Sequence, residues 1–197
     1  MAIIKTLGPS STDSFCAAEH WLRNNKDLSG DAQIKLYPNM ESVFADIQTG
    51  DLIVMPAGYT NRNNPDFSGW VDYHYYYSDI LDVIDVFSLD TMEMIVVENT
   101  DYKLDRAIVQ SSTVQLLKRN GIECKHIDYS PSKSYGLSLF DEMSYRYVIC
   151  SSSDYEKNRS EDRKKSDRII ERVNIHMIWV VYKAARLKNY PAESGAD

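Results

Sequence analysis

Residues 83–97 read VIDVFSLDTMEMIVV and contain two apolar strand patterns separated by a short polar turn. A pair of long strands near the middle of a 197-residue chain is typical of a hinge between two lobes. We therefore expect an α/β fold with two lobes and an interlobe cleft. The expected boundaries are 1–83 and 170–197 for lobe 1, and 84–169 for lobe 2.

On the N-terminal side of this stretch, short strand patterns alternate with helical patterns. This β-α-β-α-β order predicts a parallel sheet with right-handed crossovers. The expected elements are a strand at 2–7, a helix at 12–24, a strand at 33–37, a helix at 40–50 and a strand at 52–56.

On the C-terminal side the same alternation returns, so the second lobe is expected to repeat the first. A mixed-charge segment, 154–168, is expected to form an exposed helix or a mobile loop. We predict that 170–185 is one long strand that returns to the first lobe. The other expected elements are strands at 107–110, 124–128 and 147–150, and helices at 111–121 and 130–143.

Four of the expected strands run directly into clusters of hydroxyl side chains. Hydroxyls at a helix start cap free backbone N–H groups, and the helix dipole favours an anion there. Because ligands of open α/β sheets bind at the carboxyl ends of strands, the clusters predict an anion-binding crevice. Ordinary helix capping is the competing interpretation. The clusters are Ser10-Ser11-Thr12, Ser111-Ser112-Thr113, Ser130/Ser132/Ser134 and Ser151-Ser152-Ser153.

Residues 6–22, TLGPSSTDSFCAAEHWL, resemble the Gly-Pro-x-Gly-Thr-x-Ser-x-x-Ala-Ala opening of prephenate dehydratases, although Ser11 stands where the family has Gly. Residues 40–56 and the SGWV segment at 68–71 resemble later family motifs. The resemblance implies a type II periplasmic-binding-protein fold without a regulatory ACT domain. The matching residues of the opening are Gly8, Pro9, Thr12, Ser14, Ala17 and Ala18.

The chain departs from the dehydratases at their catalytic motifs. Ala57-Gly58-Tyr59-Thr60 follows the third strand, where dehydratases have Glu-Asn-Ser. The family's Thr-Arg-Phe aligns with His176, Met177 and Ile178. A methionine cannot clamp a carboxylate as arginine does, so the dehydratase machinery is missing.

The departures resemble the prephenate decarboxylases of the bacilysin and aeruginosin pathways. Those enzymes carry Met then Trp in the last strand, as Met177 and Trp179 do here, and a Pro-x-x-Tyr, as Pro56 and Tyr59 do. The resemblance implies a non-aromatising prephenate decarboxylase-like lyase of antibiotic and other secondary-metabolite biosynthesis. A diverged dehydratase-like enzyme on another acid, and a non-catalytic intracellular ligand-binding module, remain open alternatives.

The predicted site therefore combines residues from the resemblance with residues from the hydroxyl clusters and nearby cations. His176 and Tyr59 are the predicted catalytic residues, with a plain strand histidine as the alternative for His176. Arg62 and Lys133 are the nearest candidates to pair with a substrate carboxylate, and ordinary solvated side chains are the alternative. The predicted substrate-binding residues are Ser11, Thr12, Arg62, Ser111, Ser112, Ser132, Lys133 and Met177.

Composition limits the partners. The formal net charge of −7 disfavours nucleic acid and anionic membranes as partners. The expected partner is a small anionic metabolite, which local features such as the hydroxyl clusters would have to capture against this overall charge. Three scattered cysteines and the absence of metal-ligand or nucleotide motifs predict no metal and no cofactor. The N-terminal sequence lacks a signal-peptide pattern, so a cytoplasmic location is expected. The aromatic run 73–77 indicates either a pocket or an oligomer interface, compatible with a homodimer.

Overall fold

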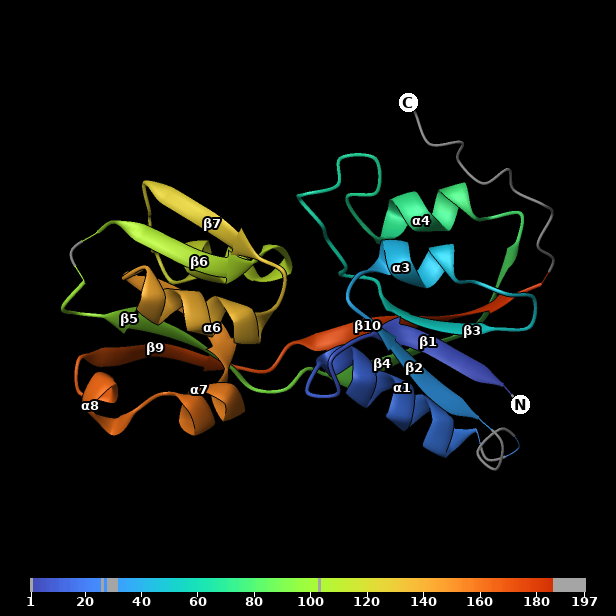
Figure 1. Cartoon of the computed structure of the whole chain (residues 1–197), viewed down its shortest axis with the longest axis horizontal. Helices are drawn as coiled ribbons and strands as arrows, with labels where there is room; N and C mark the ends of the chain where they lie inside the picture. Colours follow the sequence, from blue (N-terminus) through green and yellow to red (C-terminus); the bar gives the residue numbers. More distant parts are fainter. Residues whose placement is uncertain (1, 26, 28–31, 103, 186–197) are drawn as a thin grey trace. The chain divides into compact units, whose positions relative to one another are not determined.

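The computed structural model describes residues 2–25, 27, 32–102 and 104–185, which form two units, each built on its own five-stranded sheet (Figure 1). This mixed α/β architecture with two sheets confirms the predicted fold class. No helix within these described ranges has the length and apolar character needed to span a bilayer. Unit 1 consists of Met1–Tyr59, Gly69–Leu89 and Met177–Asp197, and unit 2 of Thr60–Ser68 and Asp90–His176.

The division between the units falls later along the chain than the expected lobe boundaries at 84 and 170. It also assigns the loop 60–68 to unit 2, so the chain passes between the units four times. This loop joins unit 2 because its Thr60 is hydrogen-bonded to Ser111. Residues 186–197, which the expected first lobe includes, lie outside the described residues.

The sheet of unit 1 has the strand order β2-β1-β3-β10-β4. β1 is parallel to β2 and β3, and β10 is antiparallel to β3. Every residue of β3 is buried, as expected for an apolar strand in the middle of a sheet. The elements are β1 (Ile3–Leu7), α1 (Asp13–Asn24), β2 (Gln33–Tyr37), α3 (Met40–Ala45), β3 (Leu52–Pro56), α4 (Trp70–Tyr76), β4 (Leu81–Asp90) and β10 (His176–Ala184).

Helices cover both faces of this sheet. On one face, Ala17, Ala18 and Trp21 of α1 pack against Ile4 and Trp179. The other face carries α3 and α4 (Figure 1), where the indole N–H of Trp70 donates to the Tyr182 hydroxyl at 2.7 Å. The predicted β-α-β-α-β order of this segment is confirmed.

The sheet of unit 2 has the order β7-β6-β8-β5-β9, with β6 parallel to β7 and β8, and β5 antiparallel to β8 and β9. The predicted helix 111–121 is a 3-10 turn followed by a shorter α-helix. The elements are β5 (Met94–Asn99), β6 (Arg106–Gln110), η1 (Ser111–Thr113), α5 (Gln115–Arg119), β7 (His126–Ser130), α6 (Lys133–Glu142), β8 (Tyr147–Ser151), α7 (Ser152–Asn158), α8 (Glu161–Lys164) and β9 (Asp167–Val173).

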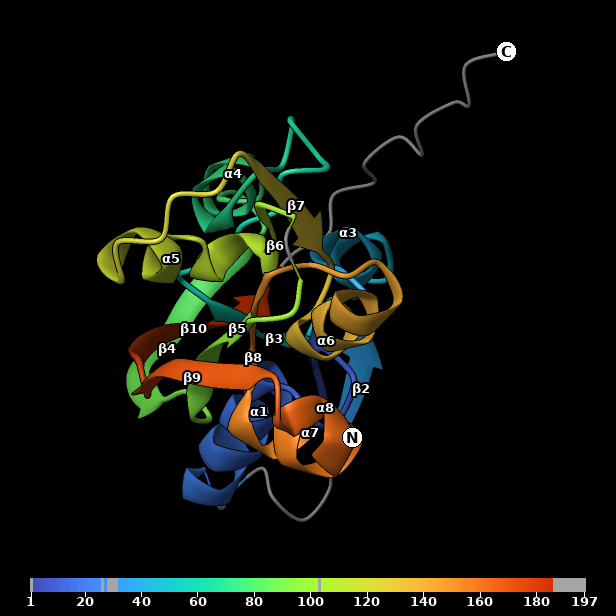
Figure 2. The ribbon, with the colours of Figure 1, turned by 90° about the vertical axis from the view of Figure 1, so that its left-hand side faces the viewer.

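Each face of the second sheet has its own core. Leu137 and Phe140 of α6 pack with Ile95 and Val97 on one face. Leu117 of α5 belongs to the cluster on the other face. Figure 2, which faces this unit, shows α5 and α6 on opposite sides of the strands.

The prediction of one long strand at 170–185 is wrong. The segment contributes to two strands, β9 in the sheet of unit 2 and β10 in the sheet of unit 1. The break lies at Asn174 and Ile175, which are bonded to Thr91 rather than to a neighbouring strand. Because the chain changes from one sheet to the other at this point, the backbone groups of these two residues take no part in the strand hydrogen bonds of either sheet.

Candidate functional site

One edge of the first sheet gathers four of the predicted site residues. Because β1, β2 and β3 are parallel, their carboxyl ends lie at the same edge. β10 begins there, since the Ala57 N–H donates to the Ile178 carbonyl at 2.9 Å. Ser11 and Thr12 follow β1, Tyr59 follows β3, and Met177 lies at the start of β10.

Met177 is half-buried and packs against the core of unit 1. A Cβ added to Gly58 would lie 3.1 Å from the Met177 sulfur, so the thioether lies close over the backbone that leaves β3. The position that aligns with the dehydratase arginine is thus occupied by an apolar group packed against apolar neighbours.

Tyr59 is held by its own backbone at this edge. Its N–H donates to the Pro56 carbonyl at 3.0 Å, and its carbonyl accepts from the Trp70 N–H at 3.2 Å. Its half-buried ring meets the Tyr73 ring edge-on, with centroids 5.9 Å apart. The tyrosine is therefore fixed against the aromatic side chains of α4.

The two hydroxyls that follow β1 differ in their surroundings. Thr12 is the N-cap of α1: its hydroxyl oxygen accepts from the Phe15 N–H at 3.3 Å and its hydroxyl donates to the Pro9 carbonyl at 2.8 Å. Ser11 is exposed. For Thr12 the structure shows the capping role that the sequence left as an alternative.

We expect Thr12→Ala to lower the free energy of unfolding by about 1 kcal/mol, because the first turn of α1 loses its cap. Ser112→Ala is the matched control, since Ser112 is exposed and a surface change away from a cap stays within about 0.5 kcal/mol. Urea denaturation of both variants measures the difference. Equal stabilities for the two variants would contradict the capping role.

The corresponding edge of unit 2 gathers the other hydroxyls. The carboxyl ends of β6, β7 and β8 are adjacent there because these strands are parallel neighbours. Ser111 and Ser112 form η1 after β6, and Ser132 caps α6 by accepting from the Tyr135 N–H at 3.1 Å. Lys133 is the first residue of α6. Both a cation and a helix N-terminus thus lie at this edge.

The loop 60–68 brings a second cation to the same edge. The Ser111 hydroxyl donates to the Thr60 carbonyl at 2.9 Å, and the two hydroxyl oxygens lie 2.8 Å apart. The Arg62 guanidinium lies over the Tyr129 ring, 4.7 Å from its centroid. Cation–π stacking orders an arginine without neutralising its charge, so Arg62 keeps its five donors for an anion.

His176 has apolar neighbours in the sequence, but its side chain is exposed in the structure. Its side chain is 69% exposed, and Nδ1 lies 2.7 Å from a carboxylate oxygen of Asp90. The exposed contact with Asp90 and the alternation along β10 fit the strand-histidine alternative, while Met177 at the next position points into the core.

The hydroxyls of the fourth cluster, Ser151-Ser152-Ser153, are hydrogen-bonded to nearby groups of the protein. Ser151 caps α7 by accepting from the Asp154 N–H at 3.1 Å. The Ser152 hydroxyl accepts from Arg172 at 2.9 Å, and Ser134 of the third cluster is bonded to Asp154. These hydroxyls are engaged with protein groups, as the capping interpretation expects.

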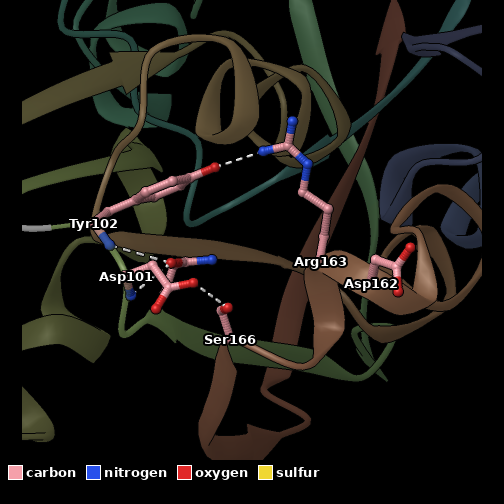
Figure 3. A pocket seen from close by; sticks show the side chains of 6 residues that line it. Asp101, Tyr102, Asp162, Arg163 and Ser166 are labelled. Carbon is pink, nitrogen blue, oxygen red and sulfur yellow. Dashed lines mark hydrogen bonds between the residues drawn. The ribbon is translucent and has the colours of Figure 1, made fainter.

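A hollow of about 270 Å³ lies elsewhere on unit 2 (Figure 3). Its polar side chains are bonded to one another: Arg163 donates to the Tyr102 hydroxyl at 2.6 Å, and Asn99 accepts from the Asp101 and Tyr102 N–H groups. We interpret it as a folded turn whose polar groups are already satisfied. Its lining residues are Asn99, Asp101, Tyr102, Asp162, Arg163 and Ser166.

Sequence reasoning missed several neighbours of the site. Tyr129 fell outside the predicted strand 124–128, whereas β7 extends to Ser130. Thr60 carried no signal, because only the folded loop brings it to Ser111. Within the described ranges, no three His, Cys, Asp or Glu side chains gather as metal ligands would.

Solved structures show the same fold. A prephenate dehydratase from Arthrobacter aurescens in complex with L-Phe is 14% identical, with a TM-score of 0.51 over 98% of this chain. The VFT2 domain of Bordetella pertussis BvgS, a periplasmic domain, is 11% identical, with a TM-score of 0.54 over 92% of this chain and 80% of its own. PhnD1 from Prochlorococcus marinus, in complex with methylphosphonate, is 10% identical, with a TM-score of 0.50 over 93% of this chain and 76% of its own.

The class defined by these findings is the mixed α/β fold with two sheets of two-lobed, periplasmic-binding-protein-like structures. The chain spans 63% of the length of the Arthrobacter dehydratase that it matches. No protein-family model matches the sequence, and no curated protein does. The fold is therefore shared with both enzymes and binding proteins, and fold alone does not decide between them.

Proposed function

We propose that the chain is a prephenate decarboxylase-like lyase that acts on prephenate or a related small cyclic carboxylate. The observation that carries this proposal is the edge of unit 1, where Met177 packs over Gly58, the residue that precedes Tyr59. A guanidinium at position 177 would hold a carboxylate in place, whereas the thioether leaves it poorly solvated.

The chemistry of prephenate explains why this difference matters. Prephenate readily loses carbon dioxide and its ring hydroxyl together, because the product ring is aromatic. A decarboxylase has to withhold an acid from the ring hydroxyl, desolvate the ring carboxylate and deliver a proton to a ring carbon. Met177 suits the second task, and Tyr59 supplies a phenol for the third.

The edge of unit 2 supports recognition of an anion. Arg62 stacked on Tyr129, Lys133, and the N-terminus of α6 place positive charge there in a chain of net charge −7. Exposed Ser112 adds a hydroxyl donor. In this proposal these groups form an anion site of unit 2, and Ser112→Ala weakens anion binding by roughly 1–2 kcal/mol.

The decisive experiment is incubation with prephenate. We expect release of carbon dioxide and conversion of the unconjugated ring diene into a conjugated one, with phenylpyruvate no faster than its spontaneous formation, because His176 and Met177 replace the Thr-Arg pair. Ultraviolet absorbance and carbon dioxide capture follow the two products, and protein-free prephenate is the control. Rapid, saturable formation of phenylpyruvate would instead establish a diverged dehydratase.

A non-catalytic ligand-binding module is the second candidate. It is favoured by the likeness to PhnD1, whose solved structure is a complex with methylphosphonate. Saturable calorimetric binding of prephenate with no release of carbon dioxide and no change in the ring diene would select this alternative.

A further inference from the structure

Exposed apolar side chains are unevenly distributed over the described residues. Seven of the ten large ones lie on three elements of unit 1, namely α4, β4 and β10, and the other three lie on unit 2. Single exposed hydrophobic residues are ordinary, whereas a group of them on neighbouring elements is typical of an interaction surface. The seven, here called the edge patch, are Val71, Tyr75, Tyr76, Val83, Ile84, Val86 and Ile178.

The three elements that carry the edge patch are neighbours in the fold. β4 is the edge strand of the first sheet and pairs with β10 (Figure 2). α4 is fixed to β10, because Trp70 and His74 are both hydrogen-bonded to the Tyr182 hydroxyl, at 2.7 and 3.0 Å. Val71 and Tyr75 follow these two residues and are one turn apart, so they lie together on the adjoining face of the helix.

Alternation along the strands places part of the edge patch on the same side of the sheet as α4. Phe87, Leu89 and Met177 pack against the core that α1 covers. Val86 and Ile178 are each one residue away from these, so they point to the opposite face. That face carries α4 (Figure 1). Apolar side chains of the helix and of both strands therefore share one side of the sheet.

The edge patch is large enough for a stable dimer. A fully exposed side chain of this kind offers on the order of 150 Å² of surface, so the seven side chains, each about half exposed, offer about 600 Å². Two copies packed together would bury about 1,200 Å² in total, which exceeds the ~1,000 Å² expected of a specific interface. A second copy of the chain can thus cover the patch without any further partner.

The position of the patch at a sheet edge also suits a second copy. Among the described strands, none pairs with the outer side of β4. The same edge of two copies can lie side by side across a two-fold axis, so one surface serves both partners. Exposed Asp79 and Asp82 border the patch, and 71–90 contains no Lys or Arg. Like charges therefore oppose the association at low salt, whereas apolar burial drives it.

We propose that the chain forms a homodimer in which the edge patches of two copies pack together across a two-fold axis, with their β4 strands side by side. The proposal is independent of the lyase function. It divides the aromatic run 73–77 between two roles, since Tyr75 and Tyr76 belong to the interface and Tyr73 is buried within unit 1.

Sedimentation analysis of the whole chain over a wide range of concentration tests the proposal. We expect a reversible monomer–dimer equilibrium that tightens as salt is added, because ions screen the acidic residues that border the patch. Val86→Lys should weaken the dimer by roughly 30-fold or more, because it brings a charge into an apolar contact. Leu104→Lys is the matched control and should have no effect, since Leu104 is 53% exposed, close to the 56% of Val86, but lies on unit 2.

Hydrogen exchange locates the interface independently of the variants. Peptides from α4 and β4 of the parent protein should exchange more slowly at high than at low protein concentration. Peptides around Leu104 and Tyr135, which are exposed on unit 2, should exchange equally at both. Circular dichroism shows whether each variant is folded, which we expect because both substituted side chains are exposed.

Several results would overturn the proposal. They are a parent protein that stays monomeric at every concentration, a dimer that Val86→Lys leaves intact, and a dimer that salt dissociates. Slower exchange on unit 2 instead of α4 and β4 would place the contact elsewhere. If exchange in α4 and β4 slows only when a Lys-rich peptide is added, the patch binds a cationic partner and not a second copy.

Discussion

Replacing Arg159 with methionine is expected to lower the free energy of unfolding of unit 2 by about 3–5 kcal/mol. Arg159 and Asp167 are both fully buried and form two hydrogen bonds, Nε to Oδ2 at 2.6 Å and Nη2 to Oδ1 at 2.7 Å. Asp141 is a second ion-pair partner of the guanidinium. Methionine removes the cation and leaves the Asp167 carboxylate buried without its main counter-charge.

The surroundings of this pair explain the size of the effect. Tyr155 donates to Asp167 at 3.0 Å, Asn99 donates to it at 2.8 Å, and the guanidinium stacks on Phe140 at 4.8 Å. These partners lie on α6, α7, β5 and β9, so the network joins both ends of the second unit's chain segment. Loss of the Arg159 charge leaves the buried hydrogen-bond donors and acceptors around it without partners.

Equilibrium denaturation with urea measures this prediction, and two further variants sharpen it. Arg163→Met is the matched control, because Arg163 is half-exposed and meets Asp141 at 3.3 Å, so it should cost only about 0–1 kcal/mol. The double variant Arg159→Met/Asp167→Asn should recover part of the loss, since no uncompensated charge remains. A single variant as stable as the parent would contradict the buried pairing.

The second large effect is expected at Lys5 of β1. Its side chain is 2% exposed, and its ammonium lies 2.8 Å from a carboxylate oxygen of Asp51 and 3.0 Å from one of Asp46. The Asp51 side chain is only 8% exposed. Lys5→Met should therefore lower the free energy of unfolding by about 3–5 kcal/mol, because Asp51 loses its buried partner.

Lys35→Met provides the control for Lys5. Lys35 also pairs with Asp46 at 2.8 Å, but it is 52% exposed, so its loss should cost about 0–1 kcal/mol. Chemical denaturation of both variants gives the comparison. Equal losses in the two would contradict a buried role for Lys5.

The ion pairs of Lys5 predict that the stability of the protein depends on pH. Burial by itself lowers the pKa of Lys5, but the hydrogen bonds to Asp51 and Asp46 outweigh it and raise the pKa above its usual value. A raised pKa in the folded state means that the stabilisation is complete below the pKa of an unfolded lysine, about 10.4, and is lost as pH rises through the folded value. Stability of Lys5→Met should lack this alkaline decline.

Much of the fold follows from local pattern. Each predicted strand at 2–7, 33–37 and 52–56 forms, because buried strands require short apolar runs bounded by turn residues. The Thr12 cap and the left-handed Gly121 after α5, with φ of 67°, also follow from residue type. Resemblance in short motifs then indicated the fold that the solved structures share.

The sequence by itself determined the alternation of strands and helices at 2–56, and the hydroxyls and cations that follow the strands, because hydrophobic period and turn chemistry are local properties. Only the tertiary structure decided that 167–184 serves two different sheets, that Arg62 stacks on Tyr129, and that the Tyr59 ring meets Tyr73 edge-on. These contacts join residues far apart in the chain, and which residues meet depends on strand order and register. Lys5 and Lys35 are the same type of residue, but only the Lys5 side chain is buried. This burial is the reason that loss of the Lys5 ion pair is expected to cost more stability than loss of the Lys35 ion pair.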